Sequence, residues 1–202
     1  RRSESDDSYR LTLKVRELCE GFRDEQWISA IGAPLLGQLL QQVAWPTDLC
    51  TLDGDAMVIR ETTHRFSRLS FHRSMVGRRL PLLMTATGRA YFAFCPQAER
   101  EKLIELMISR DDGQSALAAD RRFVERLIEH TRSKGYGENN AHWGEERKIA
   151  AIAIPVMHEA RVMGCLNLVY IAKAMPVEEA ARRFLPAMHE VVGNIQTGLI
   201  GD

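Results

Sequence analysis

The sequence feature that most constrains the fold is a pair of apolar runs near the C-terminus, joined by a very short connection. Residues 148–156 and 162–171 are rich in small and β-branched side chains, and such runs favour β-strands. Between them, residues 159–161 leave room only for a turn. Because parallel strands need a long crossover connection, these two strands must pair antiparallel.

A second hairpin is predicted in the first half of the chain. Residues 48–52 and 56–60 are strand-like and flank Asp53-Gly54-Asp55, and an Asp-Gly turn between two such runs is a strong hairpin signal. A third strand is expected over residues 66–71, where apolar and polar side chains alternate.

Helical spacing of apolar residues predicts the remaining elements. The expected helices cover residues 13–22, 25–43 with a kink or break near Gly32 and Pro34, 86–95, 97–109, 118–134, and a long last stretch from Pro176. Residues 137–144 are expected to be irregular. The chain therefore predicts an α+β domain, with a largely antiparallel sheet and helices packed on it.

Composition limits the classes of function. With 202 residues the chain can bury a full core, and 27 basic residues balance 27 acidic ones, so no overall field attracts nucleic acid or a membrane. The four cysteines are far apart, which fits reduced cytosolic thiols rather than a disulfide framework or a zinc site. No apolar run reaches the roughly 18 residues of a membrane span. We expect a cytoplasmic protein, and a fragment, because the chain begins at Arg1 rather than methionine.

Catalytic constellations are missing from the sequence. It contains no G-x-S-x-G elbow, phosphate loop or H-E-x-x-H motif, and its six histidines are scattered. We therefore expect no catalytic residue, metal or cofactor. Cys165 is either a reactive thiol or, as its apolar surroundings favour, a small buried core residue.

The clearest candidate binding feature is the start of the helix expected at residue 86. Thr85 is suited to cap that helix, and the small residues Ala86, Gly88 and Ala90 leave its first turn bare. Free amide groups and the positive end of the helix dipole would there favour an anion such as a carboxylate. The alternative is an ordinary strand-to-helix turn with a threonine cap.

Asn167 is a second candidate, because it interrupts an otherwise apolar strand. A buried amide needs hydrogen-bond partners, which are either backbone groups or a bound ligand. Alternation along the strand places Cys165, Asn167 and Val169 on one face.

Several motifs together resemble a known family. They read L-P-L-x-x-T-A-T-G-R-A at 80–90, G-Y-G at 135–137, I-A-A-I-A-I-P-V at 149–156 and G-C-L-N-L at 164–168. In this order and spacing they resemble the effector-binding domain of IclR-type bacterial transcription regulators, over nearly the whole chain. The sequence around residues 24–30, 60–73 and 165–170 is more narrowly similar to that of activators of 3-(3-hydroxyphenyl)propionate catabolism.

The resemblance implies a GAF-like domain with a curved, mainly antiparallel sheet and helices on its faces. It implies that residues 1–12 end a winged helix-turn-helix domain, 13–45 form connecting helices, and 46–202 bind the effector. The whole regulator would bind operator DNA through its N-terminal domain, mostly absent from this chain, and would assemble as a homodimer or homotetramer. Effector capture would stiffen the loops at 76–88 and 137–148.

The resemblance also implies which residues form the site. Members that sense very small acids carry an acidic residue, a cysteine and two serines where this chain has Asn139, Ile149, Asn167 and Val169. The bulkier, less polar set favours an aromatic acid against apolar walls. The predicted effector site is Leu82, Thr85, Ala86, Thr87, Gly88, Asn139, Trp143, Ile149, Cys165, Asn167 and Val169, with Arg60 or Arg68 as candidate partners of the carboxylate.

Two other classes of function fit the same features. One is a cysteine-dependent enzyme on a GAF-like fold, acting through Cys165. The other is a GAF-type regulatory module of a signalling enzyme.

Overall fold

The computed structural model describes residues 27–110, 112–140 and 147–200. Within them, six strands form one antiparallel sheet in the order β3-β2-β1-β6-β5-β4. The strands are β1 (Thr47–Asp53), β2 (Ala56–Thr62), β3 (Arg79–Pro81), β4 (Gly137–Asn140), β5 (Ile149–His158) and β6 (Arg161–Ile171). The helices are a π-helical turn η1 (Ile28–Gly32), α2 (Ala33–Val43), α3 (Ala86–Phe94), α4 (Gln97–Ile108), α5 (Ser115–Ala119), α6 (Arg121–Lys134) and α7 (Val177–Ile200).

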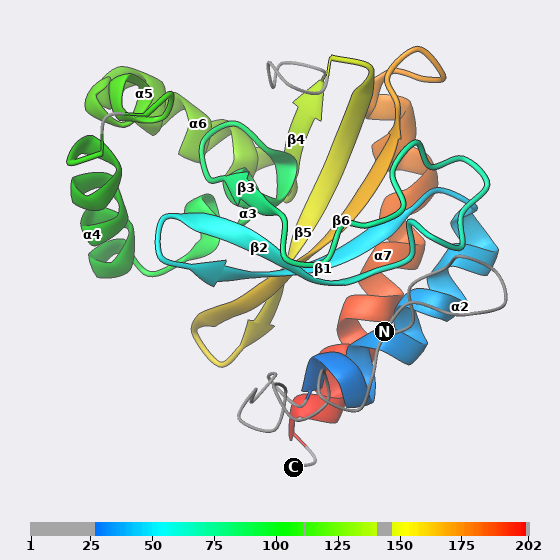
Figure 1. The fold of residues 1–202 in the computed structure, drawn as a ribbon. Helices are drawn as coiled ribbons and strands as arrows, with labels where there is room; N and C mark the ends of the chain where they lie inside the picture. The colour runs from blue at the N-terminus through cyan, green and yellow to red at the C-terminus, as the bar shows by residue number, and fades with distance from the viewer. Residues whose placement is uncertain (1–26, 111, 141–146, 201–202) are drawn as a thin grey trace, which may run out of the picture.

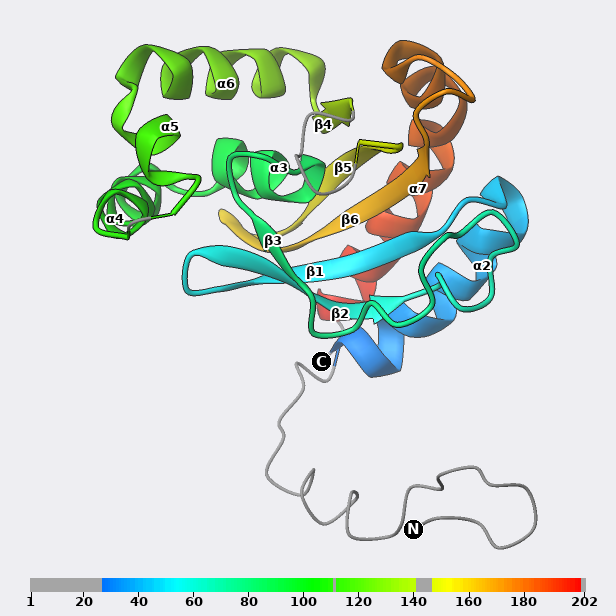
Figure 2. The same ribbon diagram turned by 45° about the horizontal axis from the view of Figure 1, so that its top comes forward.

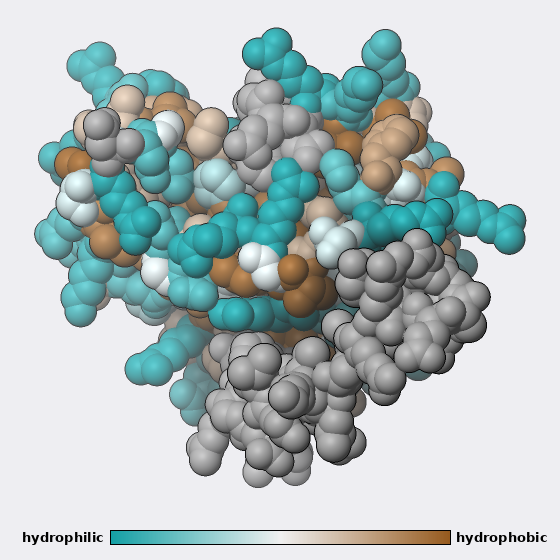
Figure 3. Space-filling view, in the orientation of Figure 1, coloured by the Kyte–Doolittle hydropathy of each residue, from teal (hydrophilic) through white to brown (hydrophobic). Residues whose placement is uncertain are grey.

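The curled sheet separates two layers of helices, which confirms the predicted α+β class. Helices α2 and α7 cover one face, and α3 lies on the other, with α6 packed beyond it (Figures 1 and 2). Each face has its own apolar core. The face seen in Figure 3 is mostly hydrophilic, with a small group of hydrophobic residues near its centre.

Alternation along β6 assigns its side chains to the two layers as predicted. Leu166 and Leu168 pack in the core under α2 and α7, whereas Cys165 belongs to the core under α3. Asn167 and Val169 lie on the same face of the strand as Cys165, because successive side chains point to opposite sides of a sheet.

Both predicted hairpins are confirmed. In the first, Asp53 pairs with Ala56, and Gly54 adopts a positive φ of 64°. In the second, β5 and β6 pair along their whole length, from Ile149 with Ile171 to His158 with Arg161. In the helix predicted over residues 25–43, the hydrogen bonding changes near the predicted kink or break, where the π-helical turn Ile28–Gly32 passes directly into the α-helix at Ala33.

The prediction of a strand over residues 66–71 is wrong. This stretch is part of a loop between β2 and β3, in which the Phe66 and Phe71 side chains are 65% and 61% exposed. The serine hydroxyls divert the backbone from strand pairing: Ser67 Oγ donates to the Ala44 carbonyl, and Ser70 Oγ donates to the His72 carbonyl. The edge of β2 pairs instead with the short β3.

Two further predictions need correction. The irregular segment predicted from residue 137 is instead a strand over residues 137–140, β4, at the edge of the sheet, where Asn139 pairs with Ala151. The single helix predicted over residues 118–134 is two helices, because Asp120 accepts from the Phe123 amide and caps the start of α6. The expectations for residues 1–22 and for Trp143 lie outside the described residues.

A substitution at Gly137 tests how tightly β4 packs on α3. A Cβ atom at this position would lie 2.2 Å from the Ala86 carbonyl oxygen and 2.6 Å from the Ala90 nitrogen. We expect Gly137→Ala to lower the free energy of unfolding by at least about 2 kcal/mol, because rigid backbone must move. Urea denaturation followed by circular dichroism measures the change.

Gly193→Ala is the matched control. Gly193 lies inside α7, and a Cβ atom added there would have nothing within 4 Å, so alanine should stabilise the chain by about 0.5–1 kcal/mol. A Gly137→Ala protein as stable as the wild type would contradict this view of the α3–β4 contact.

Candidate functional site

A cavity opens on the α3 side of the sheet. Its empty volume, including the mouth that opens to solvent, is about 470 Å³. It is lined by Asp48, Ile59, His64, Met75, Arg78, Leu80, Thr85, Ala86, Thr87, Asn139, Ile149, Ala150, Ala151, Asn167 and Val169.

The start of α3 forms one end of this cavity. Thr85 caps the helix as predicted: its hydroxyl accepts from the Gly88 amide at 3.2 Å, and its carbonyl accepts from the Arg89 amide at 2.9 Å. The Ala86 and Thr87 amides have no acceptor among the described residues. These two N–H groups and the helix dipole make this end of the cavity favourable for an anion.

Strand register builds the sheet wall of the cavity in two rows. Asp48 pairs with Asn167 across β1 and β6. In the next row, Asn139 and Val169 both pair with Ala151 of β5. Residues far apart in sequence thus stand side by side on one face, with small alanine side chains leaving space above the sheet.

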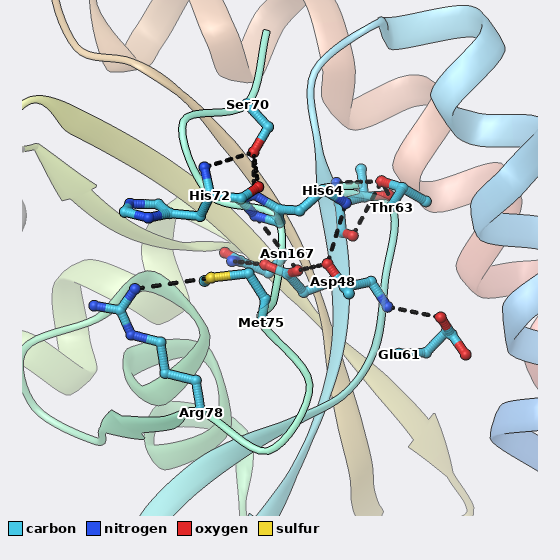
Figure 4. Close-up of polar contacts among 11 residues, drawn as sticks. Asp48, Glu61, Thr63, His64, Ser70, His72, Met75, Arg78 and Asn167 are labelled. Carbon is cyan, nitrogen blue, oxygen red and sulfur yellow. Dashed lines mark hydrogen bonds and ion pairs between the residues drawn. The ribbon is translucent and has the colours of Figure 1, made fainter. Parts of the chain in front are cut away.

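A buried carboxylate holds the polar part of this wall together. Asp48 is fully buried; its Oδ1 accepts from the Thr62 hydroxyl at 2.7 Å, and its Oδ2 accepts from Asn167 Nδ2 at 3.1 Å (Figure 4). The imidazole Nε2 of His64 lies 3.6 Å from Asp48 Oδ1. These partners offset the desolvation of a charge that would otherwise be expensive to bury.

Three buried polar atoms of lining residues lack a hydrogen bond to any described residue: Thr87 Oγ1, Asn167 Oδ1 and His64 Nε2. The Asn167 side chain is only 4% exposed and that of His64 only 2%. An unpaired buried group of this kind costs about 1–3 kcal/mol. The wall therefore has unused hydrogen-bonding capacity directed at the interior.

The loop of residues 63–78 closes the cavity on the remaining side. Thr63 anchors its start, where the Thr63 amide donates to the Thr47 carbonyl at 2.9 Å. His64, Met75 and Arg78 from this loop line the cavity, and Arg78 Nη1 donates to the Met75 sulfur at 3.8 Å (Figure 4). The loop thus contributes both a guanidinium group and an imidazole.

The structure brings together seven of the residues predicted for the site. These lining residues are Thr85, Ala86, Thr87, Asn139, Ile149, Asn167 and Val169. Leu82 and Cys165 are fully buried in the core behind the lining. Gly88 also lies behind it, where a Cβ would stand 2.4 Å from the Leu82 carbonyl oxygen.

Neither arginine predicted as a carboxylate partner is among the lining residues. Arg60 Nε donates to the Thr51 hydroxyl at 2.9 Å, and its guanidinium lies 3.6 Å from Asp53. Arg68 is part of the 63–78 loop, but of the arginines in this loop only Arg78 lines the cavity.

Sequence reasoning missed the lining residues contributed by β1, β2, β3 and the 63–78 loop: Asp48, Ile59, His64, Met75, Arg78 and Leu80. For Asp48 a signal existed, because a carboxylate inside a strand-like run needs buried partners. For the loop residues no local pattern exists, since their positions depend on how the loop folds back.

The thiols beside the cavity are poorly suited to nucleophilic chemistry. Cys50 and Cys165 are cross-strand partners, and burial raises the pKa of both thiols above the ordinary value. Burial also raises the pKa of Cys95 to about 11. Because the thiolate is the nucleophile, these residues are held in the unreactive form near neutral pH. Across the described ranges, no group of three or more potential ligands could hold a metal ion.

We expect this burial to protect the three cysteines from alkylation. At pH 8, iodoacetamide should label Cys50, Cys95 and Cys165 at least about a hundredfold more slowly in the native chain than in urea, since two pKa units lower the thiolate fraction that much. Peptide mass spectrometry gives the rate at each site. Rapid native labelling of Cys165 would restore the idea of a reactive thiol.

Comparison with known proteins gives this fold and cavity a context. The family model of the bacterial transcriptional regulator IclR C-terminal domain matches residues 23–197. The probable transcriptional regulator SauR of Cupriavidus necator is 28% identical over 149 residues, covering 74% of this chain and 58% of that protein. This chain spans about half the length of the curated relatives it matches.

Solved structures show the same fold. An IclR homolog complexed with 4-hydroxybenzoate, from Microbacterium hydrocarbonoxydans, has a TM-score of 0.72 at 21% identity, over 100% of this chain and 79% of that one. The inducer-binding domain of the PobR transcription factor from Acinetobacter, a double mutant complexed with 3-hydroxybenzoic acid, has a TM-score of 0.67 at 19% identity, over 82% of this chain and 95% of that one.

The family match identifies this fold as the C-terminal domain of a bacterial transcription regulator. The chain belongs to the IclR family. In the parts that the structure describes, no helix is long and apolar enough to cross a membrane.

Proposed function

We propose that this domain senses a small aromatic carboxylic acid of the hydroxyphenylpropionate type and thereby controls a catabolic operon. One observation carries the proposal: the unpaired Ala86 and Thr87 amides, at the positive end of α3, face a cavity whose walls are otherwise largely apolar. An anionic group and a ring on one small molecule match these two environments at once.

The apolar walls favour a ring over a two- or three-carbon acid. Ile59, Leu80, Ile149 and Val169 supply branched aliphatic surface, and Met75 adds a side chain that adapts to irregular shapes. A very small acid would leave this surface without contacts. The hydroxybenzoates bound by the two structural relatives are ligands of the proposed kind.

The carboxylate would accept hydrogen bonds from the two backbone amides. Hydrogen bonds to a charged acceptor are about twice as strong as neutral ones, and fixed amides need no reorganisation to make them. Arg78 would add a favourable positive charge from the 63–78 loop, in place of Arg60 or Arg68. The similarity of residues 60–73 to activators of 3-(3-hydroxyphenyl)propionate catabolism supports an arylpropionate as the first candidate.

The rest of the proposed regulator follows from the family. Residues 1–12 would end a winged helix-turn-helix domain that binds operator DNA in the cytoplasm, and residues 13–45 would connect it to this sensor. The assembly would be a homodimer or homotetramer. The 76–88 and 137–148 loops would have two arrangements, and the effector would bind one of them more tightly than the other. Effector binding would therefore favour that arrangement, and with it one placement of the DNA-binding domains.

Isothermal titration calorimetry against a panel of acids tests the ligand class. We expect phenylpropionates, cinnamates or benzoates to bind and pyruvate or glyoxylate not to bind, because only an aromatic acid fills the apolar walls. Binding of the short oxo-acids alone would refute the aromatic assignment.

A proline at the first residue of α3 tests the amide site. Proline is well tolerated at this position of a helix, so Ala86→Pro should fold, yet it lacks the N–H group and its ring intrudes on the space in front of it. We expect at least a tenfold rise in the dissociation constant of the aromatic acid, since one charge-assisted hydrogen bond contributes about 1.5–3 kcal/mol.

Arg121→Pro is the matched control, because Arg121 is the first residue of α6 and does not line the cavity. This variant should bind the acid as the wild type does. Unchanged affinity in a folded Ala86→Pro protein would mean that the carboxylate binds elsewhere.

A further inference from the structure

Two of the side chains with unpaired polar atoms, Asn167 and His64, lie beside the two oxygens of Asp48. Asn167 Nδ2 donates to Oδ2 at 3.1 Å, and His64 Nε2 lies 3.6 Å from Oδ1, so the amide and the imidazole flank the same carboxylate (Figure 4). Both side chains are more than nine-tenths buried, and both line the cavity. The cluster is therefore a buried group of polar side chains at the cavity rather than a solvated surface.

The orientation of the Asn167 amide is set by its neighbour. A carboxylate only accepts hydrogen bonds, so the NH₂ group must face Asp48 and the carbonyl oxygen must face away. That oxygen has no partner among the described residues. It needs a hydrogen-bond donor from whatever occupies the cavity.

The proton positions on His64 follow from Ser70. The single hydroxyl proton of Ser70 is donated to the His72 carbonyl at 2.6 Å, so the 2.6 Å contact between Ser70 Oγ and His64 Nδ1 requires a proton on Nδ1. The other ring nitrogen, Nε2, lies 3.6 Å from Asp48 Oδ1 and makes no hydrogen bond with a described residue.

We propose that this cluster recognises a ring hydroxyl of the effector. The hydroxyl donates to Asn167 Oδ1, and Asp48 holds the amide in the orientation that presents this oxygen. An ionised carboxylate or a methyl ether has no proton to donate, so either would leave this buried oxygen unpaired. This inference rests on the proposed function, because it concerns the ligand of the same cavity.

Matched pairs of acids measure the contribution of the hydroxyl directly. Calorimetry should compare 3-(3-hydroxyphenyl)propionate with 3-phenylpropionate, and 3-hydroxybenzoate with benzoate. In the wild-type chain we expect at least a tenfold preference for the hydroxylated member of one pair, because without the hydroxyl the buried Asn167 oxygen stays unsatisfied. The methyl ether of that member, which cannot donate, should bind as weakly as the unsubstituted acid or more weakly.

Asn167→Leu tests the assignment, since leucine keeps the size of the side chain without its acceptor. The preference should fall to about one, mainly through weaker binding of the hydroxylated acid. Asn140→Leu, in the exposed position beside Asn139 and away from the lining, should leave the preference unchanged. Circular dichroism and thermal melting confirm that each variant is folded.

The outcomes separate this inference from the proposed function. A wild-type chain that binds both members of each pair equally, or binds the methyl ether as well as the phenol, overturns the hydroxyl site and leaves the aromatic-acid sensor standing. A full preference retained in a folded Asn167→Leu protein also overturns it. A chain that binds no aromatic acid in either form refutes both.

Discussion

The site depends on a direct contact of backbone with backbone at the start of α3. A Cβ on Gly88 would lie 2.4 Å from the Leu82 carbonyl oxygen, and a Cβ on Gly137 would lie 2.2 Å from the Ala86 carbonyl oxygen. With no side chain between them, β3, α3 and β4 fix the first helical turn against the sheet. The Ala86 and Thr87 amides are consequently held at one end of the cavity by the fold itself, and no reorganisation is needed before they meet an anion.

A second constraint ties the irregular 63–78 loop to the sheet. The fully buried Asp48 accepts from Thr62 and from Asn167, and it lies within 3.6 Å of His64 at the start of that loop. One carboxylate therefore links β1, β2, β6 and the loop. Burying a lone carboxylate is unfavourable, so its partners cannot move independently without leaving charge unpaired. A ligand that engages Asn167 or His64 consequently acts on the loop as well as on the sheet.

The sequence was sufficient wherever a short-range rule determines the backbone. The Asp-Gly turn at 53–55 and the Thr85 cap each follow from chemistry within a few residues, and both are present in the structure. Prediction failed where contacts distant in sequence decide. The alternation at 66–71 is that of a strand, but β2 pairs with β3 instead, and residues 137–140 form a strand only because β5 lies alongside. His64 lines the cavity for the same reason: its place is set by Asp48 and by a loop with no periodic pattern.

The two ends of the cavity differ in how freely they can change with sequence. At the helix end the proposed donors are backbone amides, which are present with any residue except proline at positions 86 and 87, so the proposed affinity for an acid would be a property of the fold. At the sheet wall the proposed ligand would meet side chains such as Asn139, Asn167 and Val169, which stand in strand positions where substitution leaves the register intact. Recognition of a carboxylate can thus stay constant while the rest of the ligand is selected by a few wall residues. A domain organised in this way can keep one anion site while substitutions in the opposite wall change its specificity. Its particular side chains, rather than its fold, therefore carry the information about the ligand.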